Sequence, residues 1–415
     1  MNNKIKAAVA GAVLASASVA NAGITWDAGE WTVDMNGNVN AFAVFNDNKD
    51  SSTAIAGGLA TTSSGDNDSN STAIQTGLLP SWLGFTATTR QNDIDTSVTI
   101  SFQPNGGGGN SALAGGGGTE NRQAFLTFGD KSWGSVKVGK DLGIFASTAI
   151  LNDMTLLGVG STGLGTYANG SASTAAGKTT TLGGIGSGYL YADWKGQIAY
   201  TTPNMNGFSA TVGITQPWNA TASSALSDAS AGSSDEFAYE LQASYSWTGD
   251  FAGKAWVGGF SQEVTGVGAA ASGVDTNANA FEAGINASVM NIGLTAYAYS
   301  GEGVGTTGML RDGFDANSKK RDSDGGYVQA TYVIPMGTKL GVSYGISKLD
   351  NNTADNSSTS TMVSENTRIT VGAYHPLTKH LNLVAEYSQI ESEAMGSTIA
   401  DLETDVFSVG AILFF

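Results

Sequence analysis

The 415-residue sequence contains no cysteine. Disulfide bonds are therefore excluded, although a chain exported from the cytoplasm could form them. Stability has to come from backbone hydrogen bonding, and a closed ladder of β-strands supplies it because no strand edge is left unpaired.

Basic residues and histidines are also scarce. The chain has 19 lysines and arginines against 36 acidic residues, which gives a formal net charge of −17. This balance disfavours nucleic acid as a partner, since phosphate binding requires clustered basic side chains. The two histidines, His375 and His380, share one short polar segment without cysteine or a nearby acid. The sequence therefore predicts no metal site, no cofactor and no catalytic triad, and we expect a protein that is not an enzyme.

Long hydrophobic runs are missing outside the N-terminus. Lys4 and Lys6 precede an apolar run from Ala7 to Ala20, and the Ala20-Asn21-Ala22 sequence that follows is typical of a signal-peptidase site. The run of about 14 residues is shorter than the roughly 20 that a membrane-spanning helix requires. We therefore expect residues 1–22 to be a secretory signal peptide. Its removal takes away two lysines and no acids, which moves the net charge from −17 to −19.

Proline is rare, with 6 residues, whereas glycine is abundant, with 57. Such a composition also occurs in low-complexity secreted chains. The aromatic content of 9% argues against disorder and is typical of outer-membrane barrels, which place aromatic side chains at both membrane interfaces. The mean hydropathy of −0.06 is also expected for strands in which outward apolar and inward polar residues alternate.

Alternation is clearest at the two ends of the mature chain. From Val33 to Phe45, apolar residues occupy one face and Asp34 with three asparagines occupies the other. The segment from Thr404 to Phe415 alternates in the same way and ends the chain on an aromatic residue. One such strand would also suit a soluble sandwich, so the assignment depends on repetition.

Repetition and loop length together predict an all-β fold, a 16-stranded antiparallel transmembrane β-barrel over residues 23–415. Sixteen alternating segments can be read at 31–45, 80–89, 93–102, 121–128, 133–140, 191–201, 207–216, 236–247, 252–263, 278–289, 292–300, 324–333, 338–348, 365–374, 380–390 and 403–415. The connections alternate between short turns and long polar loops, as they do between the periplasmic and extracellular sides of outer-membrane barrels. Sixteen strands leave room for an aqueous channel.

Several segments resemble the Gram-negative general diffusion porins, and the resemblance covers essentially the whole mature chain. The segments are Asn121 to Phe125 with Trp133 to Lys140, Tyr200 to Phe208, Tyr374 to Leu381, and the terminal Phe415. The resemblance implies a homotrimer in the outer membrane, in contact with lipid and lipopolysaccharide, that passes small hydrophilic solutes and ions. It also implies that loop 141–190 folds inward as a constriction loop, and that loop 103–120 latches onto a neighbouring subunit.

The resemblance further implies a constriction at which acids of the loop face basic side chains of the wall. Asp153, followed by Met154, matches the acid of the loop, and Leu157 stands where the family often has a glutamate. Arg122 matches a wall arginine, and Lys195 is a second candidate for a wall cation. Two further basic wall positions correspond to Asn38 and Trp82. Trp82 is expected either to narrow the constriction or to belong to an interfacial girdle.

Three charged residues near the start of the loop complete the candidate set. Lys137 has the polar parity of its segment, Lys140 has the opposite parity but lies at the strand end, and Asp141 follows it. The weakened basic wall and the acidic chain predict cation preference. Two alternatives remain open, namely a substrate-selective channel with a site in loop 141–190, and a structural, adhesive or partner-filled barrel.

Overall fold

The computed structural model describes residues 23–49, 53–62, 70–104, 119–162, 180–220, 234–267, 274–308, 310–315, 318–352 and 357–415. The predicted signal peptide, residues 1–22, and most of the predicted latch, loop 103–120, lie outside the described residues.

All sixteen segments predicted from the alternation are strands, with ends that differ by a few residues. The N-terminal half of the barrel contains β2 (Trp31–Asn48), β4 (Trp82–Gln91), β5 (Ile94–Gln103), β6 (Glu120–Asp130), β7 (Gly134–Leu142), β8 (Trp194–Thr201), β9 (Phe208–Thr215) and β10 (Ala238–Trp247). The C-terminal half contains β11 (Phe251–Val267), β12 (Val274–Val289), β13 (Ile292–Glu302), β14 (Asp322–Val333), β15 (Lys339–Leu349), β16 (Val363–Pro376), β17 (Leu381–Ala394) and β18 (Leu402–Phe414).

Two short strands were not predicted. β1 (Ile24–Ala28) pairs with residues 31–35 of β2. Residues 38–48 of the same edge of β2 pair with β18. β3 (Asn70–Gln75) pairs with residues 42–47 of β2, and β4 pairs with residues 32–38 on the same edge. β1 and β18 therefore share one position around the sheet, as do β3 and β4, so eighteen strands occupy sixteen positions.

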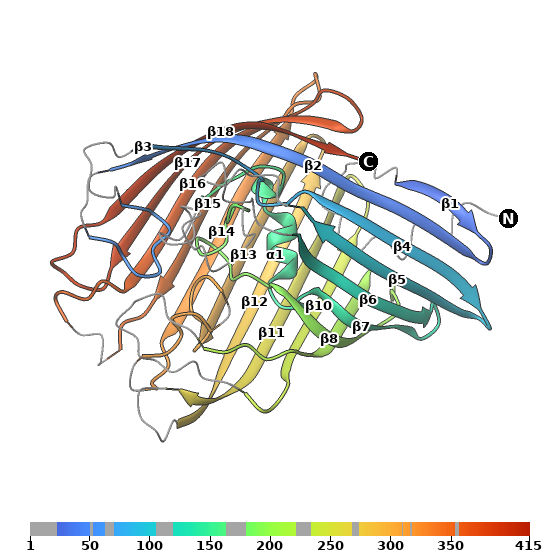
Figure 1. Ribbon diagram of the computed structural model, residues 1–415, viewed down its shortest axis with the longest axis horizontal. Coiled ribbons are helices and arrows are strands. Elements are labelled where there is room, and N and C mark those ends of the chain that lie inside the picture. The colour runs from blue at the N-terminus through green and yellow to red at the C-terminus, as the bar shows by residue number, and fades with distance from the viewer. Residues whose placement is uncertain are drawn as a thin grey trace.

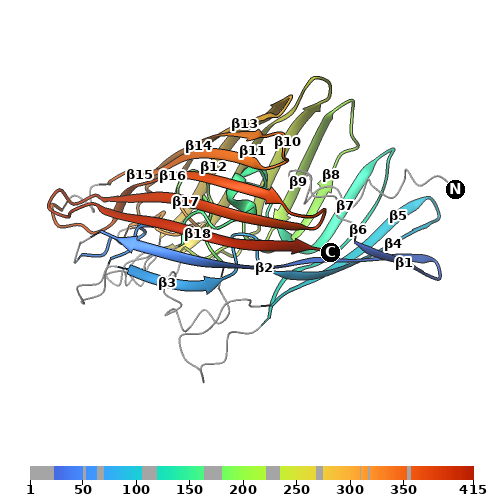
Figure 2. The ribbon, with the colours of Figure 1, turned by 90° about the horizontal axis from the view of Figure 1, so that it is seen from above.

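The sheet is closed. Consecutive strands pair antiparallel around it, and β18 returns to β2 through pairs from Thr404 with Asn48 to Phe414 with Asn38. Beyond β18, the N–H of Phe415 donates to the carbonyl of Gly37 at 3.0 Å, and the N–H of Gly37 donates back at 2.9 Å. Figures 1 and 2 show the strands enclosing one interior. The predicted 16-stranded antiparallel barrel is confirmed.

Side chains alternate between the two faces of the wall as predicted. On β5, Val98 and Ile100 are exposed on the outside, whereas Ser97 and Ser101 are buried on the inside. On β2, Val39 is 62% exposed on the outside and Asn38 is completely buried on the inside. Among the described residues, no helix is long and apolar enough to cross a membrane.

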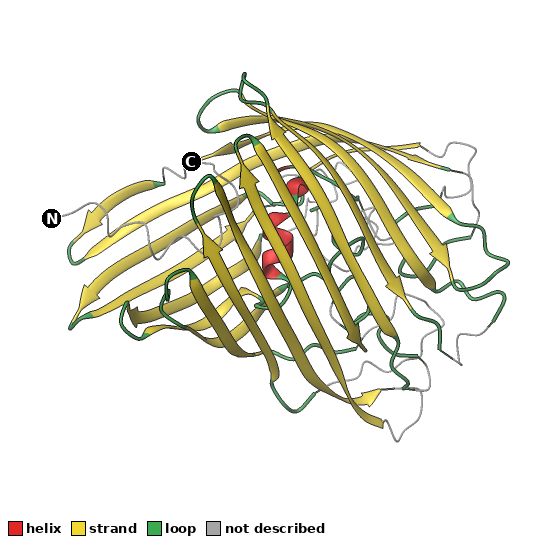
Figure 3. Ribbon diagram, turned by 180° about the vertical axis from the view of Figure 1, so that it is seen from behind, coloured by secondary structure: helices red, strands yellow, loops and turns green. Residues whose placement is uncertain are grey.

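Short turns gather at one end of the barrel and longer connections at the other (Figure 3). β4 and β5, for example, are joined through Asn92 and Asp93, with φ of 48° and 61°. Such left-handed backbone angles at two successive residues suit a tight hairpin, and Asn and Asp tolerate them better than most residues.

The connection between β7 and β8 is called here the inner loop because its described residues, 143–162 and 180–193, fold into the barrel. It contains the two short helices α1 (Ser147–Asn152) and η1 (Met154–Leu157), and Figures 1 and 3 show α1 surrounded by strands. Its apolar side chains Phe145, Ala149 and Leu190 are fully buried and belong to a cluster that includes wall residues Trp256 and Tyr327. The barrel interior thus contains a packed core where the inner loop meets the wall.

Candidate pore constriction

The inner loop enters the barrel by a sharp turn that a wall carboxylate stabilises. Glu240 on β10 accepts hydrogen bonds from the N–H groups of Ile144 and Phe145 at 2.6 and 2.9 Å through one carboxylate oxygen. The next residue, Ala146, has φ of 63°, and its N–H donates to Glu282 on β12 at 3.1 Å. Two buried acids on the inner face thus satisfy three amides of the turn that precedes α1.

A third wall glutamate holds the loop after η1. Glu386 on β17 accepts from the N–H groups of Val159 and Gly160 at 2.7 and 2.9 Å, and its other oxygen accepts from the hydroxyl of Tyr374 at 2.6 Å. The approach is so close that a Cβ at Gly158 would overlap the carboxylate. Glycine at this position therefore allows the backbone of the loop to reach the wall.

Neutral polar groups fix the helices between these anchors. Gln329 on β14 accepts from the N–H of Met154 at 2.9 Å and donates to the carbonyl of Asn152 at 2.6 Å. The hydroxyl of Tyr327, also on β14, donates to the carbonyl of Ala149 at 2.8 Å. The inner loop is therefore held against several strands on the β10–β17 side of the barrel.

Asp153 lies at the junction of α1 and η1 and is 4% exposed. One of its oxygens accepts from the N–H of Thr155, and the other accepts from the N–H of Gly184 and the hydroxyl of Tyr189 at 2.9 and 2.8 Å. The second oxygen also lies 3.7 Å from Nη2 of Arg368 on β16. Burial, and next the charge of Asp153, raise the pKa of Tyr189 well above its usual value, so the phenol stays protonated and can donate. Asp153 thus ties two parts of the inner loop to a wall cation.

Lys195 faces the interior at the start of β8 and is 2% exposed. Its ammonium group forms an ion pair with Glu240 and lies 5.8 and 5.7 Å from the ring centroids of Trp218 and Phe260. The structure therefore brings Lys195 together with Glu240 and the entry of the inner loop, and not with Asp153.

The two lysines of β7, Lys137 and Lys140, are more accessible. Lys137 on the inner face is paired with Asp141, and its side chain is 29% exposed whereas that of Asp141 is 1% exposed. Asp141 also accepts from Nε2 of Gln123 at 3.0 Å. Lys140 has the outward parity, opposite Ala124 of β6, and donates to the backbone carbonyl of Asn121 at 2.8 Å. Lys140 is therefore the one candidate that the strand register does not bring to the inner face.

Arg122 on β6 has no pairing partner on β5, because Ser101 of β5 pairs with Gln123 and the next residue, Phe102, pairs with Asn121. Its guanidinium lies 3.2 Å from Glu120 and 5.8 Å from the ring centroid of Trp194. A β-bulge redirects a side chain in this way. Within the ion pair, the side chain of Glu120 is 37% exposed and that of Arg122 is 10% exposed.

Asn38 and Trp82 lie directly opposite each other on the inner faces of β2 and β4. Asn38 donates to the carbonyl of Pro80 at 3.0 Å and accepts from Asn40 at 2.7 Å. Trp82 packs edge-on against Phe414, with ring centroids 6.1 Å apart, and donates to Asn36 at 3.3 Å. The inward position excludes Trp82 from an interfacial girdle on the lipid side.

Sequence reasoning did not identify Glu240, Glu282, Glu386 and Arg368. Each is a charged residue within a strand and on its inward parity, as Arg368 is between Asn366 and Thr370. That parity could have identified them as interior groups. It could not have identified their partners in the inner loop, because the paired residues are separated by 95 or more positions, as Phe145 and Glu240 are.

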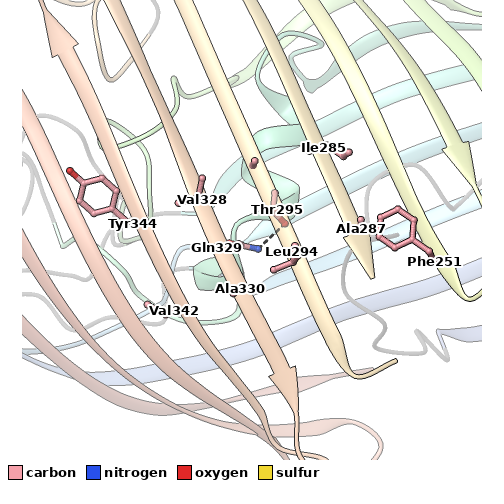
Figure 4. Close-up of a pocket in the computed structure, with 11 residues that line it drawn as sticks. Phe251, Ile285, Ala287, Leu294, Thr295, Val328, Gln329, Ala330, Val342 and Tyr344 are labelled. Atoms are coloured by element: carbon pink, nitrogen blue, oxygen red, sulfur yellow. Dashed lines mark hydrogen bonds between the residues drawn. The ribbon is translucent and has the colours of Figure 1, made fainter. Parts of the chain in front are cut away.

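A hollow of about 540 Å³ lies on the wall between β11 and β15 (Figure 4). Its apolar lining comes mainly from outward residues such as Leu294, Val328 and Tyr344. Gln329 and Thr295, which are hydrogen-bonded to each other at 3.1 Å, contribute from the inner side. The hollow therefore belongs to the outer surface and not to the solute path. Within the described ranges, no cluster of three or more metal-ligating side chains is found.

The family of the chain follows from its sequence. A model of the Gram-negative porin family matches residues 7–394, which is nearly the whole chain. The chain belongs to the Gram-negative porin family. A search of curated proteins found no match to this porin.

Solved structures show the same fold at low identity. The outer membrane channel DcaP of Acinetobacter baumannii aligns with a TM-score of 0.65 and 15% identity, covering 95% of the porin and 100% of DcaP. The anion-selective porin from Comamonas acidovorans aligns with a TM-score of 0.60 and 14% identity, covering 93% of this chain and 100% of the Comamonas porin. OmpF of Salmonella typhi, solved in complex with daunomycin, aligns with a TM-score of 0.56 and 13% identity, covering 94% of this chain and 100% of OmpF.

Family and fold together identify an outer-membrane channel protein that is not an enzyme. The expected roles of Asp153, Arg122, Lys195, Lys137 and Asp141 in ion selectivity stay predictions.

Proposed function

We propose that this porin is a passive diffusion channel for small hydrophilic solutes and ions, and that it prefers cations. The observation that carries the proposal is the inner loop, which wall carboxylates such as Glu386 hold inside a barrel with polar inner strand faces. A loop fixed in this way narrows the lumen on one side of the barrel without requiring a bound ligand to keep it in place.

Cation preference is supported by the charge at the end of the barrel that carries the long loops. Carboxylates concentrate where strands β13, β14 and β16–β18 reach that end, at Glu302, Asp322, Asp324, Glu365, Glu391, Glu393, Glu403 and Asp405. Lys49, Lys320 and Lys348 form ion pairs there, so the acids outnumber the paired cations. All eight acids have the outward parity of their strands, so their excess negative charge lies around the outer rim of the pore mouth and raises the local concentration of cations there.

Within the lumen, we assign different roles to the candidate residues. Lys137, whose side chain is 29% exposed, is the candidate whose charged group reaches solvent on the β5–β8 side, so it lines the solute path. The side chain of Arg122 is 10% exposed and is paired with the more exposed Glu120. Asp153, Lys195 and Asp141 are buried in ion pairs and position the loop more than they attract ions. Asn38 and Trp82 form uncharged wall where a basic ladder would favour anions.

The mature protein is proposed to be a homotrimer, exported by a signal peptide that is cut after Ala22, with lipid and lipopolysaccharide around its outer face. The trimer is supported by OmpT of Vibrio cholerae, described as a trimer form, which aligns with a TM-score of 0.56 and 16% identity. The outer face is suited to lipid because large apolar side chains such as Ile198 and Val212 are more than half exposed on it.

Planar-bilayer recording of the refolded mature chain tests the function. We expect conductance steps in groups of three and a reversal potential under a KCl gradient that indicates cation preference. Asp153→Asn should weaken the preference slightly and disturb the loop, whereas Asp93→Asn, which removes the same charge from an exposed turn, should leave both unchanged. A folded barrel that shows no conductance would refute a diffusion channel and favour a plugged or partner-filled barrel. An anion-selective reversal potential would refute the cation preference alone.

A further inference from the structure

A second segment, between β13 and β14, also folds inside the barrel. Its described residues are 303–308 and 310–315, and Val304 and Leu310 among them are fully buried. Both residues belong to the same apolar cluster as Phe145 and Leu190 of the inner loop. A loop that covered only the outer rim would not bury its side chains against this interior cluster.

The segment covers the inner face of the wall near the end with long loops. Ala278 and Ala280 on β12 are fully buried and share the inward parity of Glu282. A Cβ at Gly301 would lie 2.8 Å from Val304 and from Ala280, and one at Gly303 would lie 2.8 Å from the ring of Phe314 and 3.2 Å from Ala278. Val304 and Phe314 therefore occupy space inside the wall.

The same segment contacts the inner loop directly. The N–H of Tyr191 donates to the carbonyl of Thr307 at 2.8 Å, and Tyr191 forms a parallel β-bridge with Gly308. A Cβ built at Gly186 of the inner loop would lie 3.1 Å from Oγ1 of Thr307. The two loops are thus joined through backbone contacts as well as through packing.

The segment has a specific internal structure. Gly305 has φ of 73°, and a Cβ there would overlap the carbonyl oxygen of Arg311. Arg321 donates from Nη1 to the carbonyls of Asp312 and Phe314 at 2.8 and 2.7 Å. Leu310 is held at φ of 64°, which bulky residues rarely adopt unless the surroundings impose it. Backbone strain imposed in this way is characteristic of segments whose position matters for function.

We propose that residues 303–308 and 310–315 form a second restriction in the solute path, in series with the inner loop and docked onto it at Tyr191. The proposal rests on the proposed diffusion function. It implies that the size limit for solutes is set by two loops, so the channel is narrower than one in which the inner loop alone projects into the lumen.

The test compares four refolded full-length mature chains, each checked for folding by its heat-modifiable migration in electrophoresis. They are the wild type, Gly305→Ala, Gly196→Ala, and a chain lacking residues 304–320, whose flanking residues Gly303 and Arg321 are already joined by a 2.9 Å backbone hydrogen bond. Gly196→Ala is the matched control, because Gly196 is an exposed residue of β8 outside both loops and a Cβ there meets no atom within 4 Å. The measurements are single-channel conductance and the largest sugar that enters proteoliposomes in a swelling assay.

Removing one of two comparable restrictions in series should raise conductance about twofold. We expect that rise and a larger sugar limit in the deletion, a smaller rise in Gly305→Ala, and wild-type behaviour in Gly196→Ala. A folded deletion with wild-type conductance and sugar limit would overturn the second restriction while leaving the diffusion function intact. If wild type and deletion both fold and neither conducts, the diffusion function itself fails. A silent wild type with a conducting deletion would support the restriction and show that it closes the channel. If one variant does not fold, the other decides the question.

Discussion

Glu386 illustrates how a lumen-facing acid can serve structure. Its two oxygens accept three hydrogen bonds from protein groups, two of them from amides of the inner loop. Glu240 and Glu282 serve the start of the loop in the same way. At the residue scale, the sign of an interior charge therefore says little about ion selectivity until its partners are known.

Glu386→Leu should release the inner loop near Val159. Two backbone N–H groups would lose their acceptors, at a cost of about 1–3 kcal/mol each when such groups stay buried. We expect noisier single-channel currents and lower thermal stability, with a milder effect for Glu386→Gln, which keeps one acceptor oxygen. Glu391→Leu, at an exposed outward position of the same strand, serves as the control. Steady wild-type currents from a folded Glu386→Leu protein would contradict the anchoring role.

At the scale of the element, β1 completes an edge that β18 does not reach. The last pair between β18 and β2 is Phe414 with Asn38, and residues 31–35 of β2 pair instead with β1. Without β1, this part of β2 would present unpaired backbone groups at the closure of the barrel, and such edges favour aggregation.

Deleting residues 24–28 should lower the stability of the folded barrel by roughly 2–5 kcal/mol, since the hydrogen bonds of a short strand ladder are lost. The measurement is the temperature at which the compact electrophoretic form disappears in detergent. Trp26→Ser keeps the backbone of β1 and should change this temperature much less. An equal effect of the two variants would assign the stabilisation to the tryptophan side chain and not to strand pairing.

At the scale of the whole molecule, the excess of acids makes the proposed selectivity dependent on salt. The formal net charge is −17 over the full sequence, and the eight acids named above lie at the end of the barrel that carries the long loops. The Debye length falls from about 10 Å at 0.1 M salt to about 3 Å at 1 M, so charges at the pore mouth act on permeating ions mainly at low salt.

The ratio of cation to anion permeability should therefore be higher in KCl gradients centred near 0.1 M than in gradients near 1 M. Reversal potentials of one preparation at both concentrations measure it. A variant with Glu302→Gln, Asp322→Asn and Asp324→Asn should show a weaker dependence on salt. A permeability ratio that is the same at both concentrations would place the origin of selectivity deep in the lumen, where screening is weaker.

The sequence by itself determined the wall of the barrel. Alternation with a period of two fixes which residues of a strand face inward, and short turns fix which strands pair, so all sixteen predicted segments are strands in the expected order. β1 and β3 were missed because five or six residues give too little alternation to separate a strand from a loop. The inward folding of loop 141–190 was expected only through family resemblance.

The tertiary structure alone decided the partners inside the barrel. Asp153 was expected to face Arg122 or Lys195 across a pore, but its neighbour is Arg368, and Lys195 is paired with Glu240. These contacts join the inner loop to strands far away in the sequence, and nothing local in either segment specifies the other. A loop packed in a lumen has no periodic pattern, because its position depends on the wall that it meets rather than on its own hydrogen-bond repeat.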